Sequence, residues 1–176
     1  MFARAWSREL TALCMATREG PACAQLEYSG KILLPPSVLD EVKDFAEFPF
    51  MFELEAVCGG NDLRSTFCGV HEFVAEETQV YMPFWMMENL RINQGDKVVI
   101  RLAQPPLPKA TYVKFQAQST AFLDISNPKA VLEYILRDYR AFREGEIIRF
   151  EYNGQTYDLA VLEVKPQDPR GRKVGR

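Results

Sequence analysis

Histidine and closely spaced cysteines are nearly missing from this sequence. One histidine, His71, occurs in 176 residues, and no two of the four cysteines have the CxxC spacing. A structural zinc site needs three or four clustered thiolate or imidazole ligands, so we expect no metal centre and no cofactor. The isolated cysteines are typical of reduced, partly buried thiols in a cytosolic protein.

Long uncharged runs are also absent. The longest stretch without a charged residue, 78–87, is about half of the ~18 residues that a membrane span requires, so we expect no membrane insertion. Basic and acidic residues number 21 and 24, and the resulting net charge of -3 argues against binding of nucleic acid through its phosphates. Basic residues cluster in the tail 167–176, which we expect to be solvated and disordered.

The motifs of common enzyme classes are missing as well, since the chain has no P-loop, GxGxxG, GxSxG or HExxH. A barrel with catalytic aspartates usually carries them on Asp-Thr-Gly or Asp-Ser-Gly turns, and neither tripeptide occurs. Cys68 and His71 could suggest a nucleophile and its base, but residues three apart on a strand point to opposite faces. The sequence therefore predicts a protein that is not an enzyme, with a barrel enzyme of less distinctive site residues as the alternative.

Two segments of the chain, ILLPPSVLDEV at 32–42 and VYMPFWMMENL at 80–90, share one pattern. In each, three apolar residues precede a proline, and an acidic amphipathic turn follows. Proline is tolerated at the start of a helix, where its missing N–H is not needed, so each segment predicts a buried strand followed by a short helix. We interpret the pair as an internal duplication whose copies should superimpose about a twofold axis inside one barrel.

The Phe-Trp-Met-Met run at 84–87 allows two interpretations. It could form a surface that docks a partner, or it could belong to the core. The repeat favours the core, because Val38 and Leu39 occupy the places of Met86 and Met87.

The first two thirds of the chain predict a small barrel. Short helices are expected after Pro35 and Pro83, and strands are expected near residues 10–16, 28–34, 50–57, 66–75, 78–82 and 97–102. These elements form two strand–helix–strand halves in succession, and two such halves favour closure of the sheet into a barrel, since closure removes exposed strand edges. The prolines of 103–110 indicate a boundary. We therefore divide the chain into a barrel subdomain at 1–105, a smaller mixed α/β subdomain at 106–166 and the tail at 167–176.

The region after the boundary has two strong local signals. Ser126-Asn127-Pro128 begins a predicted helix, SNPKAVLEYILRDYRAF, whose apolar residues continue at helical spacing to Tyr139. Asn153-Gly154 between alternating strands predicts a two-residue hairpin. This turn fixes the register of the two strands, and the facing pairs are Phe150 with Tyr157, Ile148 with Leu159, and Arg149 with Asp158 as an ion pair.

In this order, the segments resemble the N-terminal domain of the ubiquitin fusion degradation protein 1 family. The stretches that carry the resemblance are GKILLPPSVLDEV (30–42), PFMFEL (49–54), CGVHEFVAEE (68–77), YMPFWMMENL (81–90), YVKFQAQSTAFLDISNPKAVLE (112–133) and YNGQTYDLAVLEVKP (152–166). The chain departs from the family pattern in residues 1–27, at His71, at Ala117 and in FREGE at 142–146.

The resemblance implies a double-psi β-barrel followed by an α/β subdomain, and a domain without catalytic residues that binds ubiquitin and polyubiquitin chains. Family members act with nuclear protein localisation protein 4 as cofactors of a hexameric AAA ATPase segregase. They deliver ubiquitylated proteins for degradation, including from the endoplasmic reticulum, so the expected localisation is cytoplasmic and nuclear. The resemblance assigns binding of the ATPase and of the heterodimer partner to a later tail, so we expect this chain to recruit substrates without these contacts.

Ubiquitin presents a small apolar patch ringed by basic groups, so its receptor needs exposed apolar residues beside acids. Residues near the expected subdomain boundary that fit this description are Tyr112, Phe115, Phe122 and Asp124. The alternative is that they form a buried linker between the two subdomains. An adaptor that does not bind ubiquitin is a further alternative for the function.

Overall fold

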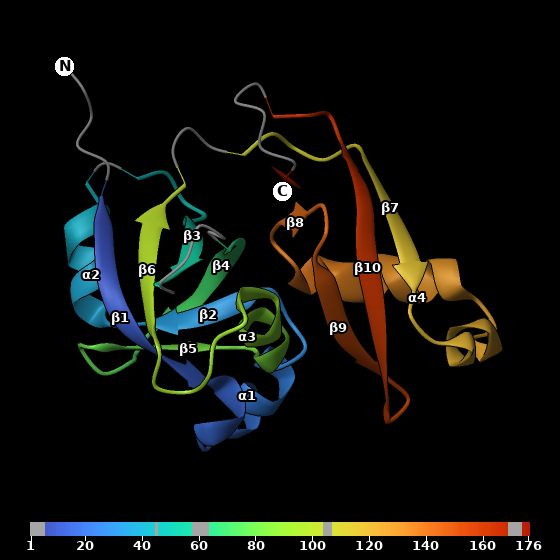
Figure 1. The fold of residues 1–176 in the computed structure, drawn as a ribbon, viewed down its shortest axis with the longest axis horizontal. Helices are drawn as coiled ribbons and strands as arrows, with labels where there is room; N and C mark the ends of the chain where they lie inside the picture. The colour runs from blue at the N-terminus through green and yellow to red at the C-terminus, as the bar shows by residue number, and fades with distance from the viewer. Residues whose placement is uncertain (1–5, 45, 58–63, 104–106, 169–173) are drawn as a thin grey trace.

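The computed structural model describes residues 6–44, 46–57, 64–103, 107–168 and 174–176 (Figure 1). In the first part of the chain, six strands close into a barrel in the order β1-β5-β2-β4-β3-β6. Their bounds are Ser7–Cys14 (β1), Lys31–Leu34 (β2), Met51–Ala56 (β3), Ser65–Phe73 (β4), Gln79–Met82 (β5) and Lys97–Leu102 (β6). The predicted barrel is confirmed, and its interior is filled by alternate apolar residues such as Phe52 and Leu54 of β3.

The barrel has an internal twofold symmetry. β1 runs parallel to β5 and β2 runs parallel to β4, while β2 meets β5 antiparallel at Leu33 and Tyr81. β3 and β6 are antiparallel to each other, and each is antiparallel to one further strand, β4 or β1. Exchange of β1 with β4, β2 with β5 and β3 with β6 leaves this pattern unchanged. The predicted placement is therefore confirmed, since the two segments occupy equivalent strands and helices of one barrel.

Each copy continues from its strand into a helix, α2 (Pro36–Val42) or α3 (Phe84–Leu90). Pro35 and Pro83 are extended residues directly before these helices, as predicted. A further helix, α1 (Pro21–Leu26), follows the 3-10 turn η1 (Met15–Thr17) and is not among the predicted elements. It begins with Pro21 after Gly20, which has a φ of 138° and no side chain to cap the helix, so proline at the first position is its one local start signal.

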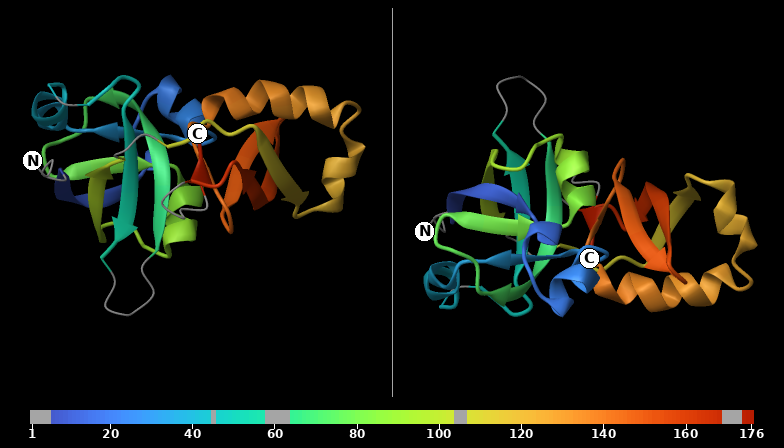
Figure 2. Two further views of the ribbon diagram at one scale, coloured as in Figure 1. Left: turned by 90° about the horizontal axis from the view of Figure 1, so that it is seen from above. Right: turned by 90° about the horizontal axis from the view of Figure 1, so that it is seen from below.

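The second subdomain contains a three-stranded sheet in the order β7-β10-β9, with α4 (Pro128–Ile135) packed on one face (Figures 1 and 2). The strands are Tyr112–Ala117 (β7), Ile147–Tyr152 (β9) and Gln155–Lys165 (β10). Asn153 and Gly154 both have positive φ, 51° and 73°, as the tight hairpin requires. All three predicted cross-strand pairs of this hairpin are confirmed.

The helix that begins at Pro128 is shorter than predicted. α4 ends at Ile135, a 3-10 turn follows as η3 (Leu136–Asp138), and Tyr139 is extended. The Tyr139 ring packs between Trp85 and Phe142, and its hydroxyl donates to the backbone carbonyl of Arg149. These tertiary contacts override the helical spacing of the apolar residues.

The prediction of a disordered tail is wrong for Val174–Gly175. These residues form β11, which pairs with β8 (Phe142–Arg143). The Ala110 N–H donates to the Arg176 carbonyl and the Arg176 N–H donates to the Pro108 carbonyl, so the segment is held on both sides. The rest of the predicted basic cluster, 169–173, lies outside the described residues.

One hydrophobic core extends through both subdomains. Its barrel part and its second-sheet part meet at Trp85, Tyr139 and Phe142. The absence of a side chain at Gly30 permits the close approach of 138–140, because a Cβ there would lie 3.0 Å from the Tyr139 Cα. Among the described residues, no helix has the length and apolar character needed to cross a membrane.

The predicted separation of Cys68 and His71 is also confirmed. Cys68 is buried on β4, where burial raises the pKa of its thiol, and His71 is exposed on the same strand. Cys14, Cys23 and Cys68 are free thiols, whereas Cys58 lies outside the described residues. The described residues contain no group of histidine, cysteine and acidic side chains that could hold a metal ion.

Candidate functional site

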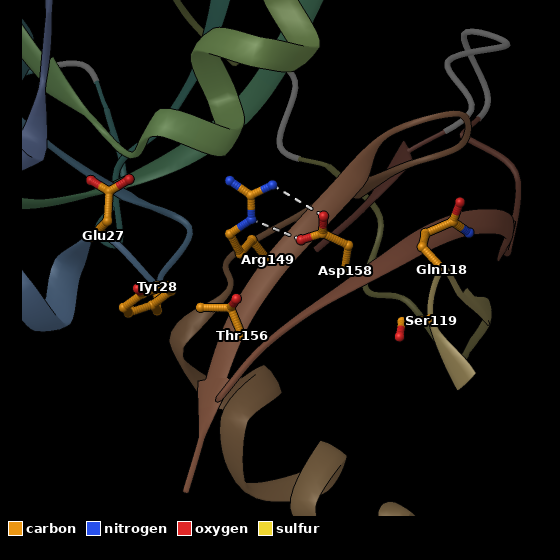
Figure 3. Close-up of a pocket in the computed structure, with 7 residues that line it drawn as sticks. All are labelled: Glu27, Tyr28, Gln118, Ser119, Arg149, Thr156 and Asp158. Atoms are coloured by element: carbon orange, nitrogen blue, oxygen red, sulfur yellow. Dashed lines mark hydrogen bonds and ion pairs between the residues drawn. The ribbon is translucent and has the colours of Figure 1, made fainter. Parts of the chain in front are cut away.

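A polar cleft of about 330 Å³ lies where the two subdomains meet (Figure 3). The barrel contributes the two residues that follow α1, and the second subdomain contributes residues that follow β7 or lie on β9 and β10. The lining residues are Glu27, Tyr28, Gln118, Ser119, Arg149, Thr156 and Asp158. The cleft is therefore formed only when both subdomains are in place.

Arg149 is the central charged residue of the cleft. It lies on β9 directly opposite Asp158 of β10, and the two side chains form a bidentate pair with Nε–Oδ1 and Nη2–Oδ2 distances of 2.8 and 3.0 Å (Figure 3). The remaining nitrogen, Nη1, lies 3.1 Å from Oε2 of Glu88 on α3. The hydrogen bonds to Asp158 raise the pKa of Arg149 above its ordinary value. Each nitrogen of the guanidinium group thus has a carboxylate partner.

Glu27 is held at the barrel side of the cleft by the start of α3. Its Oε1 accepts the backbone N–H of Phe84 at 2.7 Å, which is one of the donors that a helix leaves free in its first turn. Its Oε2 lies 3.9 Å from the Cys14 thiol, which donates to it. Burial raises the pKa of Glu27, and the Phe84 hydrogen bond and the charge of Arg149 act in the opposite direction.

Phe84 and Ile147 are exposed apolar residues beside the cleft. Phe84 begins α3 and is 46% exposed, whereas Trp85, Met86 and Met87 are buried. Ile147 is 41% exposed and lies two residues before Arg149, on the same face of β9. The predicted core assignment of 84–87 is therefore correct for three residues and wrong for Phe84.

Asn89 ties α3 to the edge of β9. Its side-chain amide donates to the Ile147 carbonyl at 2.8 Å and accepts the Ile147 N–H at 3.0 Å. Phe84 and Glu88 are four residues apart and share one face of α3. Phe84, Glu88 and Ile147 thus border the cleft on a rigid frame.

The charges around the cleft are unequal. Three carboxylates, Glu27, Glu88 and Asp158, surround one cation, Arg149. In the residues that line the cleft, all of them described by the structure, no hydroxyl donates to a carboxylate in the way that would activate a nucleophile. The excess of carboxylates makes the arrangement suited to accepting hydrogen bonds from a cation.

Glu146 is a second acid with a changed pKa, but it does not line the cleft. It is buried between the subdomains near Thr66 of β4, and its Oε1 has no hydrogen-bond partner among the described residues. Burial raises the pKa of Glu146 to about 7, with Thr66 and Arg143 acting in the opposite direction. Its place in the core indicates a role in the junction and not in binding.

The four residues predicted to contact ubiquitin do not form one surface. Tyr112 is 48% exposed on β7, where Lys165 Nζ lies 5.5 Å from its ring centre, and Asp124 is exposed at the end of η2 (Thr120–Asp124). Phe115 is on the opposite face of β7 from Tyr112, since the residues are three apart on a strand. The two phenylalanines are partly buried and pack edge-on against core rings, Phe115 on Phe142 and Phe122 on Tyr157.

The cleft residues were accessible to sequence reasoning only in part. The Arg149–Asp158 pair was predicted from the hairpin, but as a cross-strand pair and not as part of a site. Glu27 was missed because its position depends on α1. A usable signal was Phe84, an aromatic residue where the other copy of the repeat has Pro36.

The barrel, the second sheet and the polar junction define a two-subdomain protein whose candidate site lies between the subdomains. The family model "Ubiquitin fusion degradation protein UFD1, N-terminal subdomain 1" matches residues 7–106, and "N-terminal subdomain 2" of the same protein matches 109–172. The chain belongs to this family, which functions in ubiquitin-dependent protein degradation.

Curated relatives agree with this assignment. The chain is 44% identical over 144 residues to "Ubiquitin recognition factor in ER-associated degradation protein 1" of Homo sapiens, which covers 81% of this chain and 45% of that protein. It is 43% identical over 141 residues to "Ubiquitin fusion degradation protein 1" of Saccharomyces cerevisiae, covering 80% of this chain and 38% of the relative. The chain thus spans less than half the length of these relatives.

Proposed function

We propose that this chain is a non-catalytic ubiquitin-binding domain that recruits ubiquitylated proteins for an AAA ATPase segregase. The observation that carries the proposal is the 44% identity to a protein named as a ubiquitin recognition factor, over a stretch that includes both subdomains. The binding class also agrees with the cleft, whose carboxylates are paired or tied to a helix start and are not arranged around a nucleophile.

The proposal extends to the partners and place of action. We assign binding of the ATPase and of nuclear protein localisation protein 4 to parts of the relatives that this chain does not match, and we place the activity in the cytoplasm and nucleus. A domain of this size covers a small area on one ubiquitin, so a single contact should be weak. A chain of ubiquitins raises the effective concentration of each copy and should bind more tightly without new contacts.

The test is to pass mono-ubiquitin, tetra-ubiquitin and the hexameric ATPase in turn over the immobilised chain at moderate salt. We expect weak binding of mono-ubiquitin, tighter binding of tetra-ubiquitin and no capture of the ATPase. Capture of the ATPase without any ubiquitin signal would show that the chain is an adaptor of a different kind.

A further inference from the structure

We propose that ubiquitin docks on the junction face, which we define as Phe84, Glu88 and Ile147 together with Glu27, Arg149 and Asp158 of the cleft. The two exposed apolar residues contact the apolar patch of ubiquitin, and one basic side chain beside that patch enters the cleft. This inference rests on the proposed function and specifies where on the chain it takes place.

The apolar half of the junction face is held in place before binding. The Phe84 N–H is bound by Glu27, and both backbone polar groups of Ile147 are bound by Asn89. Side chains on a backbone fixed in this way lose less conformational freedom when a partner docks, so more of the contact energy contributes to affinity. Aromatic residues of this kind are enriched among those that dominate interfaces.

The exposure of Phe84 is not required by the barrel. In the equivalent helix, α2, the same position is Pro36, and the barrel closes equally well around it. Trp85, Met86 and Met87, together with Leu90 at the end of the helix, supply the apolar contacts of α3 with the core. A large aromatic side chain that the fold does not need, on an otherwise buried segment, points to a partner.

The charged half of the junction face selects a cation. Each nitrogen of Arg149 already faces a carboxylate, which balances the positive charge of this side chain and weakens its attraction for an anionic ligand. Three carboxylates face this one cation, so an incoming lysine or arginine side chain would balance the charge. Burial raises the pKa of Glu27, and the charge of Arg149 lowers it only in part. A second cation in the cleft would therefore further stabilise the charged form of this carboxyl.

A competing apolar surface lies on the barrel. Phe48 is 86% exposed, and its ring stacks edge-on against Phe50, which in turn contacts Phe73, with centroid distances of 6.0 and 5.9 Å. Glu47 is exposed directly beside Phe48. This surface has an aromatic residue and an acid, and it supplies a matched pair of control positions.

The experiment measures mono-ubiquitin binding to the whole chain by NMR titration, with four variants. Phe84→Ala and Glu27→Gln change the junction face, and Phe48→Ala and Glu47→Gln are the matched controls. The amide side chain of the Glu27→Gln variant keeps an oxygen that accepts the Phe84 N–H, so this variant removes charge and not the helix contact. We expect about a tenfold loss of affinity for Phe84→Ala, about a threefold loss for Glu27→Gln, and less than about a twofold change for either control.

The outcomes separate the site from the function. Binding of ubiquitin by the parent chain with losses only in the Phe48 and Glu47 variants would overturn the junction face and leave the proposed function intact. Absence of binding by the parent chain to mono-ubiquitin and to tetra-ubiquitin would overturn both. The resonances that shift in the parent chain provide a readout that does not depend on the folding of any variant, and we expect them to include Phe84, Glu88 and Ile147.

Discussion

The two copies of the internal repeat have the same inner face and different outer faces. Val38 and Val42 of α2 are fully buried in the barrel, and so are their counterparts Met86 and Leu90 of α3. Apolar side chains of different shapes thus serve the same position, because total volume and pattern matter more than identity. The barrel constrains one side of each helix and leaves the other free to change.

The outer side of α2 remains near solvent. Ser37 accepts a hydrogen bond from Arg8 at 2.6 Å, and Glu41 accepts the Trp6 Nε1–H at 2.7 Å. In α3, the counterpart of Ser37 is Trp85, which is buried and donates from Nε1 to the Ser29 carbonyl at 3.1 Å. The second copy therefore supplies an aromatic contact to Tyr139 of the second subdomain at a position where the first copy has a solvent-side serine, and the junction face that we propose lies beside this contact.

The largest difference in stability is expected when the outer residue of each helix, Trp85 of α3 or Ser37 of α2, is replaced. Trp85→Ala removes a buried indole that packs on Tyr139, so we expect the free energy of unfolding to fall by about 3–5 kcal/mol. Ser37→Ala removes one partly buried hydroxyl and should cost about 0.5–1.5 kcal/mol. Chemical denaturation of both variants is the measurement. Equal losses would mean that the two helices are stabilised in the same way.

Strands β1 and β4, which are equivalent in the two copies, also have different surroundings, and this difference should make stability depend on pH. Lys31 and Gln79 are the same position of the two copies, so the residues that pair with them, Gly69 of β4 and Thr11 of β1, are also the same position. Three residues earlier on each strand, Thr66 of β4 therefore corresponds to Arg8 of β1. Arg8 reaches the solvent-side carboxylates of Glu41 and Glu77, whereas Thr66 lies under the buried Glu146. Glu146 therefore places beside Thr66 of the second copy a group whose pKa burial raises to about 7.

We expect stability to fall as the pH rises from about 4.5 to about 7. Burial raises the pKa of Glu146 to about 7 in the folded chain, so the folded state binds the proton more tightly than the unfolded state. Its stabilising effect is complete below the ordinary value of 4.5 and is lost by about pH 7. A shift of this size corresponds to about 3 kcal/mol at most. Denaturation of the parent chain and of Glu146→Gln across this range is the test, and the variant should lack this part of the pH dependence.

Asn89 of α3 and Glu41 of α2 occupy equivalent positions, and a smaller difference in stability is expected between their variants. Asn89→Ala removes both hydrogen bonds to the backbone of Ile147, and we expect a loss of about 1–2 kcal/mol. Glu41→Ala removes a partly exposed hydrogen bond and ion pair and should cost less than about 1 kcal/mol. Hydrogen exchange of the Ile147 amide should increase in Asn89→Ala alone, and unchanged exchange would contradict the assignment.

The smallest effect is expected for the acids Glu88 and Asp40. Glu88→Gln weakens a partly exposed pair with Arg149, and the expected cost in stability is about 0.2–1 kcal/mol. Asp40→Asn disrupts an exposed pair with Lys43 and should leave the denaturation midpoint unchanged. A larger loss for Asp40→Asn than for Glu88→Gln would show that α2 depends on surface charge in a way that its contacts do not reveal.

The parts of the fold that were predictable depend on local chemistry. Asn153-Gly154 determines the hairpin because positive φ is required at both positions, and the prolines before α2 and α3 mark the start of each helix. The missed parts depend on contacts between distant residues. Tyr139 leaves the helical pattern because Trp85, far away in the chain, packs against it. Glu27 could not be recognised as a cleft residue before the second subdomain was placed opposite to it.

The pairing of β2 with β5 has a consequence for how such a barrel can arise. Leu33 and Tyr81 are the same position of the two copies, and they pair with each other across the twofold axis. A contact of this type is isologous, because each half presents the same surface to the other, as in a homodimer with C2 symmetry. A single strand–strand–helix–strand unit, present as two separate chains, therefore has the geometry needed to close the same barrel. In the present chain the two halves give the second subdomain different contacts, because the first half places Gly30 and Lys31 against Tyr139 and Asp138, whereas the second half packs Trp85 on Tyr139.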